Sequence, residues 1–435
     1  MRRRHKHLIF VICTLFSIGY ISFRILSGND QTEWTDEVEN SPKKITEASE
    51  YYEDVNFIKE HRPRFETPGN DRQKRISSLL EKYSIDWRSP IQENIWHVAE
   101  KWVSARKLYP ESSPLISSVL RYLSSAPIVK ADFGYGGTQL KITLLLEGGQ
   151  LAVFKPRWYP RDFLVTGEPY AGRDRHNAEV AAFHLNRLLN FSRVPIVVGR
   201  TIDLRNEIKS VATPRLINTF FTREGNLCFY GKCLYCKGPD DGVCAQGDKL
   251  EGVVILWLPK KLTLEKWKHP WRRSYKEGRR MRWETDDSYC RTFVKNTSPY
   301  DKPPRLLDIM DTCILDFLVG NADRHRYETF KNINNSMLII LDNGKSFGNP
   351  FEDELSILAP FTQCCLLRRS TYERLQMLTD GVLSEVLKTV MELEPLAPVL
   401  TQPHLLALDR RLKVVMDKAH WCMKQYGEMN ILVDE

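Results

Sequence analysis

Apolar residues recur along the chain with two different periods, and the period changes near the middle of the sequence. From Lys130 to Pro156, apolar and β-branched residues alternate with polar ones on both sides of Gly148 and Gly149, which is typical of two strands joined by a tight turn. Short strands are also expected near Ile196 and in the cysteine-rich segment that follows. The run VVILWLP, Val253–Pro259, predicts a further apolar strand.

Helical spacing appears once in the first part of the chain and dominates the second part. It predicts helices over Arg173–Leu189, Leu306–Val319, Thr371–Leu393 and Pro403–Gln425. The first of these carries Glu179 in its first turns, and the second leads directly into the loop around Asp323. A strand-rich part followed by a helical part, joined near Trp257, predicts an α+β fold with two lobes.

The N-terminal segment differs from the rest of the chain. The basic residues of MRRRHKH precede sixteen mostly apolar residues, Leu8–Phe23, which is the pattern of a signal-type segment. No small-x-small cleavage site follows clearly, so we expect residues 1–26 to form a cytosolic tail and an uncleaved membrane anchor; a cleaved signal peptide is the alternative. Residues 27–86 are polar and aperiodic and predict a flexible lumenal stem. Residues 87–256 and 257–435 are then the N-lobe and the C-lobe.

The composition is that of an ordinary globular protein, with 42% hydrophobic and 27% charged residues among 435, and it excludes a disordered chain. Three Asn-x-Ser/Thr triplets, at Asn190, Asn296 and Asn334, are candidate glycosylation sites in a lumenal domain. Glycans there require exposed positions.

The chain contains ten cysteines, which suits the disulfide-forming compartment that the N-terminus predicts. Cys228, Cys233, Cys236 and Cys244 have spacings that could bind zinc. Since no histidine lies inside this cluster, disulfides are favoured.

The remaining lumenal cysteines are spread along the second half. Cys364 and Cys365 are adjacent, so we expect them to bond to two distant partners, and Cys290 and Cys422 are available. Cys313 lies in an apolar helical run and is expected to be a buried free thiol.

Residues suited to phosphoryl transfer occur in one order along the chain. The glycine-containing hairpin is followed by Lys155, by Glu179 on a helix, by a linking strand, by the loop aspartate Asp323 and by Asp342 at the end of an apolar strand. This is the order of parts in a protein-kinase fold. There the lysine contacts nucleotide phosphates and is held by the glutamate, the first aspartate accepts the hydroxyl proton, and the second binds metal. Alone, Asp323 could cap a helix and Asp342 could belong to a turn, but the ordered set favours a nucleotide-dependent phosphotransferase.

The motifs depart from those of ordinary protein kinases. The usual His-Arg-Asp is here Asp323, Arg324 and His325, and Glu328 stands where asparagine is normal. Asn343 and Gly344, rather than Phe and Gly, follow the second aspartate. An ordinary kinase pattern would therefore not match this chain.

Seven segments resemble the atypical secretory-pathway kinases, a family that includes the Golgi casein kinase and the glycosaminoglycan xylosylkinase. They are GGTQLK (Gly136–Lys141), VFKP (Val153–Pro156), DRHNAEVAAFHL (Asp174–Leu185), CFYGKC (Cys228–Cys233), GNADRHRYETF (Gly320–Phe330), LDNGKSFGNP (Leu341–Pro350) and SILAPFTQCC (Ser356–Cys365). The resemblance covers roughly Lys130 to the C-terminus. It is closer to the xylosylkinase branch, through GEPYAGRDRHNAEV (Gly167–Val180) and KSFGNP.

The resemblance implies a role for each matching residue. Asp323 would be the catalytic base, and Glu179 and Asp342 would bind the divalent metal, Mn²⁺ or Mg²⁺, with Glu179 also pairing with Lys155. Nucleotide (ATP) binding is implied for Gln139, Lys155, Glu179, Ile255, Leu256, Trp257, Leu258, Glu328 and Asp342. In that set, Ile255–Leu258 would be the adenine hinge and Glu328 would replace the asparagine. The implied disulfides are Cys228–Cys244, Cys233–Cys236, Cys290–Cys364 and Cys365–Cys422. The inactive member of the family departs from glutamate at the position of Glu179. Because residue 179 is a glutamate here, nothing suggests that this chain is that inactive member.

Basic residues gather between Pro259 and Trp283, where ten Lys or Arg face two Glu, an excess equal to the whole chain's net charge of +8. Aromatic residues are interleaved with these basic residues. The aromatic rings could stack on sugars, and the basic side chains could bind an acidic polymer. Alternatively the tryptophans pack the lobe and the charges are solvated. A nucleic-acid partner is excluded by the lumenal location. The aromatic residues are Trp257, Trp267, Trp271, Tyr275 and Trp283.

Three functions are compatible with these features. The resemblance implies transfer of the ATP γ-phosphate to the xylose 2-hydroxyl of the proteoglycan linkage region, with galactosyl-xylose as acceptor, by a type II Golgi membrane protein that forms a homodimer or a heterodimer within the family. The second is a protein kinase acting on Ser-x-Glu sites of secreted proteins. The third is a non-catalytic lumenal binder of acidic glycans. Spacing alone does not choose between sugar and protein acceptors.

Overall fold

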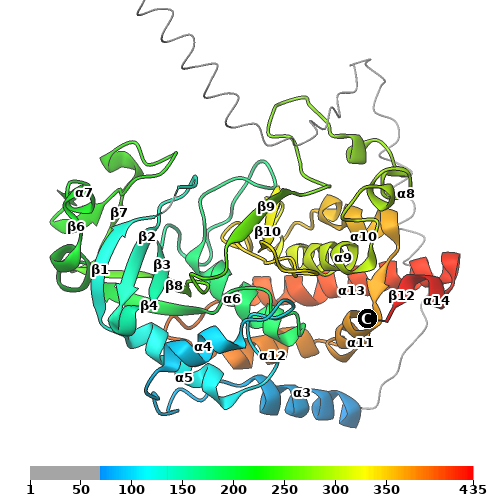
Figure 1. The fold of residues 1–435 in the computed structure, drawn as a ribbon, viewed down its shortest axis with the longest axis horizontal. Coiled ribbons are helices and arrows are strands. Elements are labelled where there is room, and N and C mark those ends of the chain that lie inside the picture. Colours follow the sequence, from blue (N-terminus) through cyan, green and yellow to red (C-terminus); the bar gives the residue numbers. More distant parts are fainter. Residues whose placement is uncertain (1–68, 135, 435) are drawn as a thin grey trace, which may run out of the picture. The chain divides into compact units, whose positions relative to one another are not determined.

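The computed structural model describes residues 69–134 and 136–434. The predicted anchor and most of the predicted stem lie outside the described residues. Within the described part of the chain, no helix is both long and apolar enough to cross a membrane. The predicted α+β architecture is confirmed: the largest sheet lies in the first half, which also contains helices, and the second half is mainly helical (Figure 1).

A five-stranded antiparallel sheet forms the core of the first half, in the order β1-β2-β3-β8-β4. Its strands are β1 (Ile128–Phe133), β2 (Ile142–Leu146), β3 (Leu151–Pro156), β4 (Val197–Asp203) and β8 (Lys249–Leu256). The predicted hairpin is β2 and β3. The strand predicted over Val253–Pro259 is β8, which begins earlier, at Lys249, and ends earlier, at Leu256.

Side chains along β3 alternate between the two faces of the sheet, and this alternation decides which way Lys155 points. Ala152 and Phe154 are fully buried on one face. Phe154 lies beneath Gly252 of β8, where an added Cβ would come within 2.3 Å of the ring. Since successive side chains point to opposite faces of a strand, Lys155 projects from the other face of the sheet.

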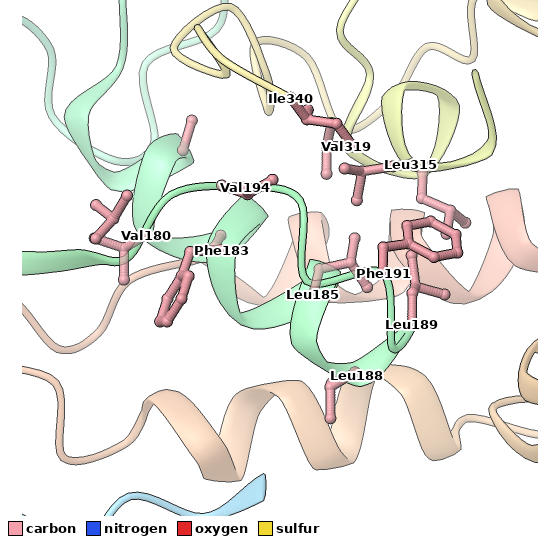
Figure 2. Close-up of a cluster of buried hydrophobic side chains, with 14 of the residues drawn as sticks. Val180, Phe183, Leu185, Leu188, Leu189, Phe191, Val194, Leu315, Val319 and Ile340 are labelled. Carbon is pink, nitrogen blue, oxygen red and sulfur yellow. The ribbon is translucent and has the colours of Figure 1, made fainter. Parts of the chain in front are cut away.

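Helix α6 (His176–Leu188) is buried along its whole length and connects the sheet to the helical half. Figure 2 shows a cluster of buried side chains around it, labelled Val180, Phe183, Leu185, Leu188, Leu189, Phe191, Val194, Leu315, Val319 and Ile340. Leu315 and Val319 belong to α9 (Pro303–Val319), and Ile340 belongs to the apolar segment before Asp342. The helix that carries Glu179 therefore packs against both segments that lead to the aspartates.

The other helices of the described residues cover the sheet or form the second half of the fold. Those before the linking strand are α3 (Gly69–Tyr83), α4 (Ile95–Trp102), α5 (Pro114–Ser125), α6 (His176–Leu188) and α7 (Pro214–Ile217). Those after it are α8 (Tyr289–Thr292), α9 (Pro303–Val319), α10 (Ala359–Cys364), α11 (Arg369–Met377), α12 (Val382–Met391), α13 (Gln402–Tyr426) and α14 (Glu428–Ile431).

Three small sheets complete the fold. Their strands are β5 (Phe220–Arg223), β6 (Asn226–Phe229), β7 (Val243–Cys244), β9 (Leu264–Lys268), β10 (Arg326–Phe330), β11 (Leu367–Arg368) and β12 (Leu432–Val433). The antiparallel pair of β9 and β10 follows the linking strand and the Asp323 loop, respectively. It therefore lies directly beside the candidate catalytic loop.

The domain begins earlier than predicted. Residues 27–86 were expected to form a stem, but α3 packs into the fold and buries Ile76, Leu79 and Tyr83 almost completely. Arg72 of α3 forms an ion pair with Glu385 of α12 at 2.6 Å. The sequence missed this because the charged residues of α3 mask a narrow apolar stripe.

The single helix predicted over Thr371–Leu393 is two helices, so this prediction was wrong. Asp380 and Gly381 between α11 and α12 both have positive φ, of 61° and 75°. Gly381 adopts this conformation at little cost, whereas a helix cannot continue through it. The turn lets α12 pack against α6 and α3.

The C-terminal half also reaches across the predicted lobe boundary at residue 256. Glu394, after α12, accepts a hydrogen bond from His184 of α6 at 2.8 Å, and both side chains are fully buried. Asn177 of α6 donates to the carbonyl of Val399 at 2.9 Å. Helix α6 is thus held from both halves of the chain.

The cysteines form four disulfides in the pairs that the family resemblance implies. These are Cys228–Cys244, Cys233–Cys236, Cys290–Cys364 and Cys365–Cys422. Cys313 is free and buried, as predicted. Of the glycosylation candidates, Asn296 and Asn334 are exposed and Asn190 is half-buried.

Candidate active site

Buried Lys155 is the centre of a cluster of three carboxylates, of which Asp174 and Glu179 are buried and Asp342 is exposed. Its Nζ lies 2.6 Å from Glu179 Oε1, 2.6 Å from Asp342 Oδ1 and 3.0 Å from Asp174 Oδ2. Burial by itself would lower the pKa of Lys155, but the three carboxylates outweigh it and hold the pKa well above its usual value. The lysine therefore carries a permanent positive charge that fixes the carboxylates in place.

Asp342 comes to this cluster from the end of the apolar segment Leu338–Leu341. Its φ is 61°, a left-handed conformation that aspartate tolerates better than bulky residues. Lys155 first, and then Lys141 and Arg324, hold the pKa of Asp342 below its ordinary value. Its side chain is 73% exposed, so this carboxylate faces solvent as well as the cluster.

Asp174 belongs to the cluster although the sequence did not single it out. It lies two residues before α6 and packs against Gly344, where an added Cβ would lie 2.6 Å from the Asp174 carboxyl carbon. Ligand oxygens of Asp174, Glu179 and Asp342 all lie within 4.8 Å of one another. This arrangement suits a divalent cation that prefers oxygen ligands.

Asp323 and Arg324 are neighbours in the loop before β10, but their side chains form hydrogen bonds with different residues. Arg324 donates two hydrogen bonds to the carboxylate of Asp316 on α9, at 2.8 and 2.9 Å. It also donates to the side chain of Asn343 at 2.9 Å and to the carbonyl of Leu341. One guanidinium thus ties the end of α9 to both residues that flank Asp342.

Asp323 is held by an aromatic residue far away in the sequence. The Tyr275 hydroxyl donates a hydrogen bond to Asp323 Oδ1 and lies 3.1 Å from Nδ1 of His325. Burial raises the pKa of Asp323, and the hydrogen bond from Tyr275 partly opposes that effect. The Tyr275 ring also contacts Tyr170 edge-on, with 4.8 Å between ring centroids.

Glu328 lies on β10, on the same side as the acidic cluster. Burial raises its pKa, and the nearby cation Arg324 opposes this while Asp342 adds to it. The backbone carbonyl of Glu328 accepts a hydrogen bond from the N–H of Ile339 at 2.8 Å. This bridge brings the strand of Glu328 next to the segment that ends at Asp342.

The remaining predicted nucleotide residues lie around the edge of this arrangement. Gln139 is half-buried in the loop between β1 and β2. Ile255–Leu258, which ends β8 and continues beyond it, is half-buried. Leu256, Trp257 and Leu258 line a cavity of about 780 Å³ on the side of α4, and the acidic cluster does not contribute to its wall.

The tryptophans of the basic segment mostly pack the lobe. Trp271 and Trp283 are each only 5% exposed, and their indole N–H groups donate to Gln363 and to the carbonyl of Arg272. Of the two alternatives left open by the sequence, packing in the lobe therefore holds for these two residues, and stacking on sugars does not. Tyr275, which is 48% exposed and contacts Asp323, remains at the surface.

Sequence reasoning missed Asp174 and also missed the contact of Tyr275 with Asp323, for different reasons. Asp174 stands in the segment DRHNAEV, but a kinase pattern expects one acidic residue on this helix, and Glu179 satisfied it. Tyr275 lies 48 residues before Asp323, so only the folded chain brings them together. A second acidic residue just before the helix was the one signal available for Asp174.

Comparison with known proteins agrees with this geometry. Residues 94–431 match the family described as Golgi casein kinase, C-terminal, Fam20. Over 341 residues the chain is 55% identical to the human protein named glycosaminoglycan xylosylkinase, covering 78% of this chain and 83% of that one.

Two solved structures have the same fold. A structure of hydra Fam20 with sugar is 49% identical, with a TM-score of 0.77, and the match covers 79% of this chain and 99% of that one. A structure of the Golgi casein kinase with Mn/ADP bound is 28% identical, with a TM-score of 0.76, and covers 94% and 96% of the two chains.

Proposed function

Because the chain belongs to the Fam20 family of Golgi casein kinases, we propose that it is an ATP-dependent glycosaminoglycan xylosylkinase. In this reaction the γ-phosphate of ATP passes to the 2-hydroxyl of xylose in the linkage region of a proteoglycan. The observation that carries the proposal is the meeting of Lys155, Glu179 and Asp342 in one cluster, beside the loop of Asp323. Its acceptor is supported by the 55% identity to a protein named xylosylkinase and by the sugar in the hydra structure.

The acidic cluster fits a divalent metal, which we assign to Asp174, Glu179 and Asp342. Three carboxylates against one ammonium, that of Lys155, leave a formal charge of −2, which a divalent cation neutralises. Mn²⁺ and Mg²⁺ both prefer oxygen ligands, and the relative solved with Mn/ADP supports Mn²⁺. A bound metal would neutralise charge on the nucleotide phosphates.

The chain's own residues supply the proton transfer and the positioning. The acceptor oxygen attacks the γ-phosphorus, its proton moves to Asp323, and the bond to the β-phosphate oxygen breaks as ADP leaves. Lys155 contacts the phosphates. Arg324, next to Asp323, holds the loop of Asp323 and the segment of Asp342 in fixed positions through its hydrogen bonds to Asp316 and Leu341.

The other predicted nucleotide contacts remain part of the proposal. Gln139 would touch the phosphates from the glycine-containing loop, and Ile255–Leu258 would hold adenine. Glu328 takes the place of the asparagine of ordinary kinases. Its position on β10 near Asp342 and Arg324 supports this assignment.

We also propose the cellular setting. The family is a Golgi family, and four disulfides agree with a lumenal domain. A single-pass type II membrane anchor at residues 1–26, a stem after it and dimerisation within the family belong to this proposal. The catalytic domain would extend from α3 to the C-terminus.

The proposed function is tested with purified residues 69–435, Mn²⁺ and labelled ATP. A galactosyl-xyloside and a Ser-x-Glu peptide are offered in parallel. Phosphate is expected on the xyloside, to be lost on removal of Mn²⁺ with a chelator and in Asp342→Ala. Asp240→Asn, at an exposed surface turn, is the control and should retain full activity.

The other outcomes assign the chain elsewhere. Phosphate on the peptide rather than the xyloside would make it a protein kinase like the Golgi casein kinase. Phosphate on neither acceptor would favour a non-catalytic binder of acidic glycans.

A further inference from the structure

Three basic side chains lie on one face of the two-stranded ribbon formed by β9 and β10. Lys266 pairs with Glu328 across the ribbon, and Lys268 pairs with Arg326. Residues directly opposite one another, and residues two apart on a strand, share a face. Lys266, Lys268 and Arg326 therefore project together, and all three are exposed.

The opposite face of the ribbon explains why this orientation is fixed. Trp267 stacks on Tyr327 with an interplanar angle of 8°, and Tyr327 is only 1% exposed. The indole N–H of Trp267 donates to the hydroxyl of Thr329 at 3.0 Å. Because this face is anchored in the lobe, a one-residue slip of either strand would bury the cations.

One carboxylate shares this face with the three cations: Glu328, directly opposite Lys266. Burial raises the pKa of Glu328, and Arg324 first, then Lys266 and Arg326, oppose this, but three cations beside one carboxylate leave an excess of positive charge. Basic residues elsewhere in this segment form ion pairs. Arg273 pairs with Glu354, Arg282 pairs with Asp286, and Lys261 pairs with Glu100.

Among the residues that the structure describes, Lys266, Lys268 and Arg326 form no ion pair. Like charges directly opposite each other on a ribbon, as at Lys268 and Arg326, are destabilising. The repulsion would be relieved by an anion from outside the chain.

The ribbon is continuous with the catalytic loop. Arg326 follows Asp323 by three residues, and the N–H of His269, next to Lys268, donates to the carbonyl of His325 at 3.0 Å. Glu328, on the same face, lies near Asp342. An acceptor that reaches Asp323 would therefore have its attached groups near this cationic ribbon.

We propose that Lys266, Lys268 and Arg326 bind acidic residues of the acceptor polypeptide next to the serine that carries the xylose. This inference rests on the proposed function, since it takes the acceptor to be a glycosylated polypeptide. The neutral sugar occupies the site at Asp323, and the peptide is one glycosidic bond away from the xylose. The cationic ribbon would then make the enzyme prefer acidic polypeptides, although the ribbon takes no part in the phosphoryl transfer itself.

The test compares three acceptors: a galactosyl-xyloside without peptide, a galactosyl-xylosyl peptide with Asp and Glu around the serine, and the same peptide with Asn and Gln. The double variant Lys268→Gln with Arg326→Gln is compared with the wild type. Lys424→Gln, an exposed lysine on α13, is the matched control.

For the wild type at low salt, KM should be lower for the acidic peptide than for the neutral peptide by about three- to tenfold, as for a few exposed ion pairs. The double variant should lose this difference through KM with kcat unchanged, and salt should weaken it in the wild type. The rate on the disaccharide and the KM for ATP should stay within about twofold.

The proposal also predicts a change of preference. Lys268→Glu with Arg326→Glu should favour a peptide with lysines around the serine over the acidic peptide. Three results would overturn the proposal. The wild type could have equal KM values for the acidic and the neutral peptide. The glutamine variant could lose activity equally on all three acceptors, or it could have a raised KM for ATP. Failure of the proposed function itself would be recognised separately, because the wild type would then leave even the plain disaccharide unphosphorylated.

Discussion

At the scale of single residues, two cations organise the site by different means. Lys155 gathers three carboxylates by charge, at 2.6 to 3.0 Å. Arg324 uses its planar, multidentate guanidinium to join Asp316, Leu341 and Asn343. Lysine could not replace Arg324, because three fixed directions of donation are needed at once.

Asp174 should contribute to metal affinity as much as Asp342 does. Asp174→Asn removes one of three carboxylates from the cluster, so the Mn²⁺ concentration for half-maximal activity should rise about tenfold. The stabilisation of the fold by Mn²⁺, measured as a shift in Tm, should fall in parallel. Asp162→Asn, at an exposed position of the loop before α6, should change neither quantity.

Tyr275 should set the pH dependence of the reaction. Asp323 must be ionised to accept a proton, and the hydrogen bond from Tyr275 stabilises its ionised form and so lowers the pKa of the carboxyl group. Tyr275→Phe removes that bond, the pKa rises, and the acid limb of kcat/KM should move to higher pH by about one unit. Tyr170→Phe keeps its ring contact and should leave the profile in place. An unmoved acid limb in Tyr275→Phe would show that another group titrates there.

At the scale of elements, α3 decides where the folded domain begins. A protein starting at residue 87 lacks the side chains of Ile76, Leu79 and Tyr83, which fill the surface of α6 and α12. Each such buried side chain stabilises the fold by about 2 kcal/mol. We therefore expect residues 87–435 to have a Tm lower than that of residues 69–435, by several degrees in thermal unfolding.

The comparison has an internal control at the surface of α3. Lys74→Gln changes a residue of the same helix that is exposed. Its Tm should stay within about one degree of the parent protein, since isolated surface charges contribute little. Equal Tm values for the 69–435 and 87–435 proteins would mean that α3 does not stabilise the domain.

At the scale of the whole molecule, two disulfides tie the second half together. Cys290–Cys364 and Cys365–Cys422 close loops of 74 and 57 residues and converge on adjacent cysteines at the end of α10. Closing a loop of this size limits the unfolded chain and is worth about 4 kcal/mol in the chain-entropy model.

Replacing both Cys365 and Cys422 by serine should therefore lower the free energy of unfolding by about 4 kcal/mol. Denaturant titration of the variant measures this directly. Replacing the free and buried Cys313 by alanine tests packing alone, and a smaller loss is expected there. If the double serine variant were as stable as the parent, the bridge would have no role in folding stability.

The sequence alone was sufficient for the order of the parts and for most of the candidate site. Alternation over Lys130–Pro156 and helical spacing over Leu306–Val319 are local signals, and β2, β3 and α9 appear where these signals lie. Lys155, Glu179 and Asp342 were chosen from their place on such elements, and the structure brings them together. Periodicity predicts such helices and strands well, because the periodic pattern depends only on neighbouring residues in the chain.

Only the tertiary structure decided features that depend on partners distant in the sequence. Asp174 joins the acidic cluster through its fit against Gly344, and Tyr275 reaches Asp323 from 48 residues away. The choice between packing and sugar contact for Trp271, which the sequence left open, and the return of α12 onto α6 also depend on distant partners. Spacing along the chain fixes which way a side chain points on its own helix or strand. What that side chain then meets is decided by how helices and strands pack, and no local pattern encodes it.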